Sequence, residues 1–175
     1  MPATVSTVKI YVLLADRGTQ NSQNGTLSLL NAGWAVIHLH RPMAIGAANA
    51  APLVTAPHVV VVFLEAELGM CNKALTLEIE LLTEDGGRVE IPGPTGPQVV
   101  RLEQPIMVPS PSGVPTGFPG HASAMMDLST GLPLAPGIYR WQARLNGKEE
   151  DDWSARFYVA PPPQPATFGL PHAAR

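Results

Sequence analysis

The sequence has a single cysteine, Cys71, among its 175 residues. One cysteine excludes an internal disulfide and also a zinc site built from CxxC pairs. A nucleophilic role would require a basic partner that activates the thiol, and no residue pattern identifies one. We therefore expect Cys71 to be a small buried or loop residue.

Charged residues are also scarce, at 14% of the chain, with 11 lysines and arginines against 14 aspartates and glutamates. The basic residues are scattered singly, so they form no stripe able to neutralise successive phosphates. We therefore expect no nucleic-acid partner.

The N-terminal stretch MPATVSTVKIYVLLADR lacks the basic start of a signal peptide, and its short apolar run ends at Asp16 and Arg17. Such a stretch is typical neither of a secretory signal nor of a membrane span. The sequence thus predicts a protein without a membrane span that is made in the cytoplasm.

Catalytic motifs are missing as well: no GxSxG elbow, Walker loop, GxGxxG after a strand or HExxH occurs. The acidic run Glu149–Asp152 lies on one predicted loop, so its carboxylates share one solvated environment, whereas catalytic carboxylate pairs need different environments. The run also lacks the spacing and the glycine of a calcium loop. We therefore expect no enzyme activity, no cofactor and a solvated loop tip at these residues.

Helical periodicity is absent, because no window of about 11 or more residues has the i, i+3, i+4, i+7 pattern with caps at both ends. What the sequence has instead is alternation of apolar and polar residues. In 73–82, for example, Leu75, Leu77 and Ile79 share one face of an extended chain. The alternation predicts strands at 8–15, 26–40 with a bend at Gly33, 58–65, 73–82, 98–104, 122–129, 137–145 and 152–159.

About eight strands joined by turns predict an all-β, antiparallel sandwich of immunoglobulin-like or jelly-roll-like type, with long Pro- and Gly-rich loops. We expect one sandwich domain over residues 1–160 and a Pro-rich C-terminal arm over 161–175. The strand at 58–65 is apolar on both faces and should be central. The last two strands form a hairpin whose apolar face predicts a core of Leu77, Ile79, Trp141 and Phe157.

Three segments are too long and too rich in proline to be simple connections: 42–57, 105–121 and 160–175. They carry more apolar residues than solvated linkers do, so we expect them to dock on protein partners or on further copies of this chain. The candidate docking residues are Met43, Ile45, Phe118, Phe168 and Leu170. Three consecutive prolines at 161–163 favour an extended arm.

A carbohydrate-binding sandwich is one alternative function. It requires Trp34, Trp141 or Trp153 to be exposed as a platform on which a sugar ring stacks. The alternation of the last two strands places Trp141 and Trp153 inside, so the alternative depends mainly on Trp34.

A His-dependent metalloenzyme is the other alternative. His38 and His40 share a face of a strand and His58 begins the next strand, so their convergence would give three imidazole ligands for zinc. No fourth ligand and no carboxylate that could orient the imidazoles occurs at a spacing typical of a zinc site. We therefore expect no metal site.

The order of these features resembles a family of uncharacterised small β-sandwich proteins from bacteria and phages. The resemblance rests on a first strand ending in YVLLADR, then NGTLSLLNAGW, LTLEIELLTEDG, PGIYRWQARLNG and a closing strand with a tryptophan, over about residues 8 to 160. It implies the sandwich fold and no particular activity. The sequence therefore favours a non-enzymatic structural or interaction module of a larger assembly, for example the capsid or tail surface of a phage virion.

Overall fold

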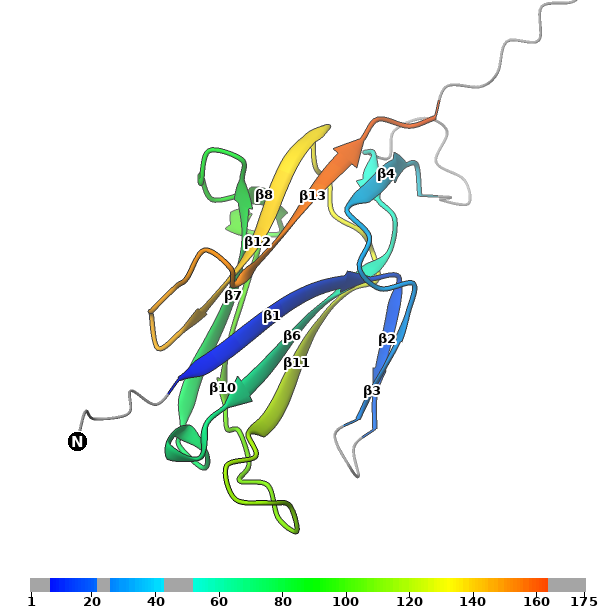
Figure 1. Ribbon diagram of the computed structural model, residues 1–175. Coiled ribbons are helices and arrows are strands. Elements are labelled where there is room, and N and C mark those ends of the chain that lie inside the picture. Colours follow the sequence, from blue (N-terminus) through cyan, green and yellow to red (C-terminus); the bar gives the residue numbers. More distant parts are fainter. Residues whose placement is uncertain (1–6, 22–25, 43–51, 164–175) are drawn as a thin grey trace, which may run out of the picture.

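The computed structural model describes residues 7–21, 26–42 and 52–163 (Figure 1). This part of the chain is all-β, as predicted, with thirteen strands, one 3-10 turn and no α-helix. The elements are β1 (Val8–Ala15), β2 (Arg17–Gln20), β3 (Leu27–Leu30), β4 (Val36–His40), β5 (Val54–Thr55), β6 (His58–Ala66), η1 (Leu68–Met70), β7 (Leu75–Thr83), β8 (Glu90–Gly93), β9 (Gly96–Val99), β10 (Arg101–Ile106), β11 (Gly120–Leu128), β12 (Gly137–Leu145) and β13 (Ser154–Ala160).

The long strands form two sheets that enclose one core. The first sheet has the order β1-β6-β11 and the second has the order β10-β7-β12-β13-β4-β5. Two further hairpins, β2–β3 and β8–β9, stand beside the sheets. Figure 1 shows β1 lying across the strands of the second sheet. Nothing in the described ranges forms a helix that is long and apolar enough to span a bilayer.

The chain visits the two sheets in the order of an immunoglobulin-like sandwich. β6 pairs with β11 in the first sheet, and β7, β12 and β13 are neighbours in the second, as the B–E and C–F–G strands are in that fold. The Tyr139 hydroxyl, near the start of β12, donates a hydrogen bond to the carbonyl oxygen of Ala135 at 2.9 Å. This contact has the form of the tyrosine corner of immunoglobulin-like domains, so the structure favours this type over the jelly roll.

The core between the sheets is built by alternate residues of each strand. Leu77, Ile79, Trp141 and Phe157 all belong to it and are almost completely buried, which confirms the predicted core. Leu77 and Ile79 of β7 pair with Leu145 and Ala143 of β12. The core-facing residues of these two neighbouring strands therefore lie directly opposite one another.

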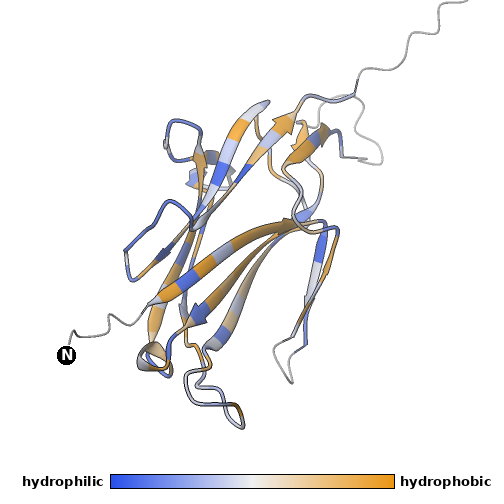
Figure 2. Cartoon of the chain, in the orientation of Figure 1, coloured by the Kyte–Doolittle hydropathy of each residue, from blue (hydrophilic) through white to orange (hydrophobic). Residues whose placement is uncertain are grey.

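β6 is buried on both faces and is the central strand of the first sheet, as predicted. Val60, Val62 and Leu64 face the main core. Val59 and Val61 face the other way, into a second cluster with Ala15 that Leu27, Leu29, Phe63 and Met125 complete. Hairpin β2–β3 therefore covers part of the outer face of this sheet. Figure 2 shows β6 coloured as hydrophobic along most of its length, whereas β12 and β13 alternate.

The prediction of a single strand over 26–40 is wrong. The chain leaves the extended conformation at Asn31 and Gly33, whose φ angles are 49° and 85°, and the segment is divided into β3 and β4. β3 stays with the outer hairpin, whereas β4 joins the second sheet beside β13. β4 runs parallel to β13, so the predicted all-antiparallel pattern has this one exception among the described pairs.

The predicted number of about eight strands is also too low. The additional strands are short, and β2, β5 and β8 lie outside the predicted strands. The predicted strand 98–104 is divided between the end of β9 and most of β10. β8 and β9 have Pro92 directly opposite Pro97, and proline is rare in central strands, so the pattern did not predict this hairpin. Their pairing depends on the turn that brings the two segments together.

Candidate interaction surface

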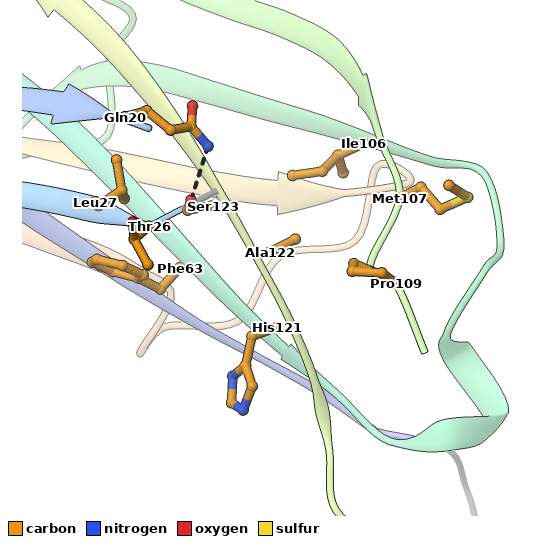
Figure 3. Close-up of a pocket in the computed structure, with 10 residues that line it drawn as sticks. All are labelled: Gln20, Thr26, Leu27, Phe63, Ile106, Met107, Pro109, His121, Ala122 and Ser123. Carbon is orange, nitrogen blue, oxygen red and sulfur yellow. Dashed lines mark hydrogen bonds between the residues drawn. The ribbon is translucent and has the colours of Figure 1, made fainter. Parts of the chain in front are cut away.

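A groove opens beside β11, on the side of the sandwich where the edges of the two sheets meet (Figure 3). Its volume is about 520 Å3. Hairpin β2–β3 lines one side with Gln20, Thr26 and Leu27, and the segment at the end of β10 lines the other with Ile106, Met107 and Pro109. Between them lie Phe63 of β6 and His121, Ala122 and Ser123 of β11. We call it the edge groove.

β11 is an edge strand in the described part of the chain, because it pairs there only with β6. It has nine residues, GHASAMMDL, and contains no proline, lysine or arginine; its one acidic residue, Asp127, is next to its C-terminal end, away from the groove residues His121–Ser123. Natural proteins usually protect such edges with those residues, since an exposed edge offers unpaired N–H and C=O groups to another strand. β11 is therefore a long edge without the usual protection.

Of the other edge strands, β5 has only two residues, and β10 and β1 differ from β11 in composition. β10 carries Pro105 together with Arg101 and Glu103, which form an ion pair. β1 carries Lys9, whose Nζ lies 3.3 Å from Oε1 of Glu65. Both strands thus have the charges or the proline that discourage pairing with a further strand, and the contrast singles out β11.

On one side the edge groove is shaped by hairpin β2–β3. Nε2 of Gln20 donates a hydrogen bond to the hydroxyl oxygen of Ser123 at 3.4 Å, which connects the hairpin to β11 (Figure 3). Leu27 of the hairpin packs against the outer cluster of β6, which includes Phe63. The apolar wall of the groove is therefore held by the same packing that buries the second face of β6.

The opposite side is held by the chain after β10. Val108 is completely buried, and its carbonyl oxygen accepts a hydrogen bond from the backbone N–H of Asn72 at 2.8 Å. Oδ1 of Asn72 in turn accepts one from the backbone N–H of Ser110 at 3.1 Å. Since Val108 is anchored inside, Met107 next to it faces outward and is 57% exposed.

Phe118 is the only predicted docking residue that lies within the described ranges. Its side chain is 49% exposed and contacts His121 edge to face, with ring centroids 6.3 Å apart. Since His121 lines the edge groove, Phe118 extends the apolar surface from the groove onto the connection between β10 and β11. Met43, Ile45, Phe168 and Leu170 lie outside the described residues.

The predicted docking loops are partly built into the fold. In the 42–57 segment, Thr55 is buried in β5, and its backbone N–H and its hydroxyl oxygen both bond to Leu132 at 2.9 Å. In the 105–121 segment, Ile106 packs against the core. The sequence pattern identified the apolar content of these loops but not the neighbouring edge, because a strand without proline, lysine or arginine is equally typical of the middle of a sheet.

The tryptophans do not form a platform for a sugar ring. Trp141 and Trp153 are buried in the core. Trp34 is half-buried and packs edge to face against His58 and Phe157, with ring centroids 5.7 and 6.4 Å away. Each ring is therefore used within the domain, and the condition for the carbohydrate-binding alternative is not met.

The three histidines do not converge. His38 and His40 are exposed on β4, whereas His58 is buried at the start of β6. Nδ1 of His58 lies 2.9 Å from the carbonyl oxygen of Ala56 and donates to it. The described residues contain no group of three His, Cys, Asp or Glu side chains able to hold a metal ion. Burial removes the hydration of the imidazolium and lowers the pKa of His58, so its ring is neutral near pH 7.

The buried carboxylate of Glu80 has a structural role. Glu80 is fully buried, and its Oε2 lies 2.5 Å from Nη1 of Arg144, which also lies 2.8 Å from Oε1 of Glu78. Hydrogen bonds to these carboxylates raise the pKa of Arg144, so the cation is retained throughout the accessible pH range. Nε of Arg144 also binds Glu149 of the acidic run, whose four residues are exposed, as predicted.

Cys71 is buried, as expected, and its thiol donates to the carbonyl oxygens of Ala66 and Glu67 at 3.7 and 3.6 Å.

The chain matches no protein-family model and no curated protein. The resemblance to small bacterial and phage β-sandwich proteins therefore stays a prediction, and the geometry of the edge groove carries the functional argument.

Proposed function

We propose that this protein is a non-enzymatic interaction module that joins a larger assembly through the edge groove and the adjoining connection between β10 and β11. The observation that carries the proposal is the combination of an unprotected nine-residue edge strand with an apolar groove beside it. An edge of this kind binds extended segments by strand addition, in which main-chain hydrogen bonds supply affinity and side-chain pockets supply specificity.

The exposed apolar residues of the connection support the same surface. Met107, Val114 and Phe118 are 57%, 43% and 49% exposed, and all three lie between β10 and β11. Several large apolar side chains exposed along one connection are typical of a protein–protein contact, whereas isolated ones are ordinary. Glu78, Glu80 and Arg144 of the second sheet are instead paired with one another.

The setting that we propose is a multi-subunit particle, with a phage virion as the example that the family resemblance suggests. In this proposal the protein is made in the cytoplasm, needs no cofactor, and contributes surface and contacts to the particle. Neither alternative function gains support from the described residues, because the tryptophans are packed against the domain and the histidines are apart.

Site-specific photo-crosslinking tests the proposal. A photoreactive amino acid replaces Met107 or Phe118 in the producing cell, and the crosslinked species are identified by mass spectrometry. The matched control replaces Gln98, which is exposed on β9 and is not among the residues that line the edge groove. We expect one defined protein, or the chain itself, to be captured from the groove positions and not from the control. Equal capture at all three positions, or none, would refute the proposed function.

A further inference from the structure

We propose that the occupant of the edge groove is the C-terminal arm of a second copy of this chain. In this arrangement residues 166–170 of one copy add as a short strand to β11 of the next copy, with Phe168 and Leu170 entering the edge groove. The inference rests on the proposed function, because it names the partner of the same surface.

The arm has the pattern of a short strand with one apolar face. Residues 166–170 read Ala-Thr-Phe-Gly-Leu and are flanked by a proline on each side. In an extended chain alternate side chains share a face, so Ala166, Phe168 and Leu170 are together, opposite threonine and glycine. Proline does not donate to a sheet ladder, so the flanking prolines confine the strand to this segment.

The edge and the groove match this segment in length and in chemistry. Five extended residues span about 17 Å, which is shorter than the nine-residue β11. Phe63, Ile106 and Met107 offer apolar surface on both sides of the β11 edge. The groove lining contains no lysine, arginine, aspartate or glutamate, and the arm carries no charged side chain before Arg175. Neither surface therefore brings an unpaired charge into the contact.

The position of the arm favours a second copy over its own groove. Trp34 contacts both His58, at the start of β6, and Phe157 of β13, so β13 ends near the start of β6. The groove residues of β11 pair with the other half of β6, since Ser123 lies opposite Phe63. Figure 1 shows β13 ending on the opposite side of the molecule from the connection between β10 and β11.

The prolines of the arm strengthen this argument. Pro161–Pro163 are exposed and follow directly on Ala160. A polyproline path advances about 3.1 Å per residue and cannot reverse tightly. Figure 1 shows Pro161–Pro163 leading from the end of β13 away from the connection between β10 and β11. The direction of these prolines therefore favours the groove of a neighbouring copy over the groove of the same chain.

A contact between the arm of one copy and the groove of the next is heterologous. Such contacts produce closed rings when the rotation between copies closes, and open filaments when it does not. We therefore expect the full-length protein to form oligomers larger than a dimer as its concentration rises. A two-fold symmetric dimer through a shared face would leave the arm unused.

The test uses two variants, each of which lacks one of the two surfaces of the proposed contact. One variant lacks residues 164–175 and keeps the groove, and the other carries Met107→Lys and keeps the arm. Sedimentation velocity should show each alone as a monomer with the melting temperature of the folded parent. Mixed at equal concentrations, they should form a one-to-one heterodimer and nothing larger, because a single arm and a single groove are available.

Single substitutions in the arm refine the result. Phe168→Asp and Leu170→Asp should each weaken association at least about tenfold, as buried apolar anchors do. Ala173→Asp, outside the five-residue segment, introduces the same charge and should change association less than about twofold. Tyr158→Lys, an exposed residue of β13, should likewise leave the oligomer intact.

Failure of this inference and failure of the proposed function give different results. If the arm-deleted protein assembles like the parent, or if the full-length protein stays monomeric at all concentrations and the two variants do not pair, the arm is not the occupant. Capture of a different protein by photo-crosslinking at Met107 or Phe118 would then still support the proposed function. Absence of such capture would refute the proposed function as well.

Discussion

At the scale of single residues, the centre of the core is aromatic. Trp141 is completely buried, and Tyr139 and Phe157 face one another across β12 and β13 with ring centroids 5.9 Å apart. The indole N–H of Trp141 has no hydrogen-bond partner among the described residues. The ring therefore contributes through its packing rather than through a polar contact.

Trp141→Ala should destabilise the domain by roughly 3–5 kcal/mol, because it removes a large side chain from a closed core and leaves a cavity. Trp141→Phe should cost less, since it keeps an aromatic ring and removes an unpaired donor. Urea unfolding measures both. The control is Tyr158→Ala, at an exposed position of β13, which should change the free energy of unfolding by about 0.5 kcal/mol or less. Equal midpoints for Trp141→Ala and the parent would contradict the burial of this residue.

His58 should make the stability depend on pH. Burial lowers the pKa of His58 in the folded protein, whereas the imidazole of the unfolded chain titrates near 6.5. Between these two values the unfolded chain binds a proton that the folded protein does not bind. The free energy of unfolding from this residue should therefore fall as the pH drops below about 6.5 and level off below the folded pKa.

Urea unfolding between pH 8 and pH 5 measures this dependence. His58→Gln should remove part of the decrease that the parent shows over this range. His40→Gln is the matched control, because His40 is exposed on β4, and it should leave the decrease unchanged. The same pH profile for the His58→Gln variant and the parent would show that His58 is not responsible.

At the scale of elements, the turn after β11 joins the two sheets. Gly131 has a φ of 69°, and a Cβ atom at this position would lie 2.1 Å from the backbone carbonyl oxygen of Thr55. The backbone N–H of Thr55 donates to the carbonyl oxygen of Leu132 at 2.9 Å, so β5 is bonded to this turn. The close approach of the two backbones requires glycine.

Gly131→Ala should therefore destabilise the protein more than the left-handed backbone alone explains. Gly147→Ala is the matched control, because Gly147 has a φ of 76° and no atom lies within 4 Å of its added Cβ. We expect about 1–2 kcal/mol for Gly147→Ala, from backbone strain, and a clearly larger loss for Gly131→Ala. Thermal and urea unfolding compare the two. Equal losses would show that the approach of β5 to the turn is not tight.

At the scale of the whole molecule, the two sheets share one core. Residues of β1, β6, β7, β12 and β13 belong to the same buried cluster, and Trp153 is also part of it. A domain with a single shared core of this size usually unfolds cooperatively. The arm adds nothing to this core within the described chain, because β13 ends at Ala160 and Pro161–Pro163 are exposed.

Tryptophan fluorescence and far-UV circular dichroism should thus report one coincident unfolding transition. Deletion of residues 164–175 should leave its midpoint unchanged when the protein is monomeric. Two separate transitions would mean that the second sheet, which contains Trp141 and is directly preceded at β13 by Trp153, unfolds independently of the first. A lower midpoint after the deletion would mean that the arm packs on its own domain.

The sequence by itself determined the all-β class, the central position of 58–65 and the buried set around Trp141 and Phe157. These properties follow from local alternation, which places successive side chains on opposite faces whatever the rest of the chain does. The solvated acidic tip and the buried Cys71 were predicted for similarly local reasons. The apolar content of the connection before β11 was visible too, and Phe118 lies on it.

Only the tertiary structure decided which strands are neighbours. Pairing of β4 parallel to β13, burial of Glu80 beneath Arg144, and the separation of His38 and His40 from His58 depend on contacts between residues far apart in the sequence. The edge groove is the clearest case. A segment such as 120–128 has the same alternation in the middle of a sheet as at its edge, and only the absence of a neighbour on one side makes β11 a surface for another strand.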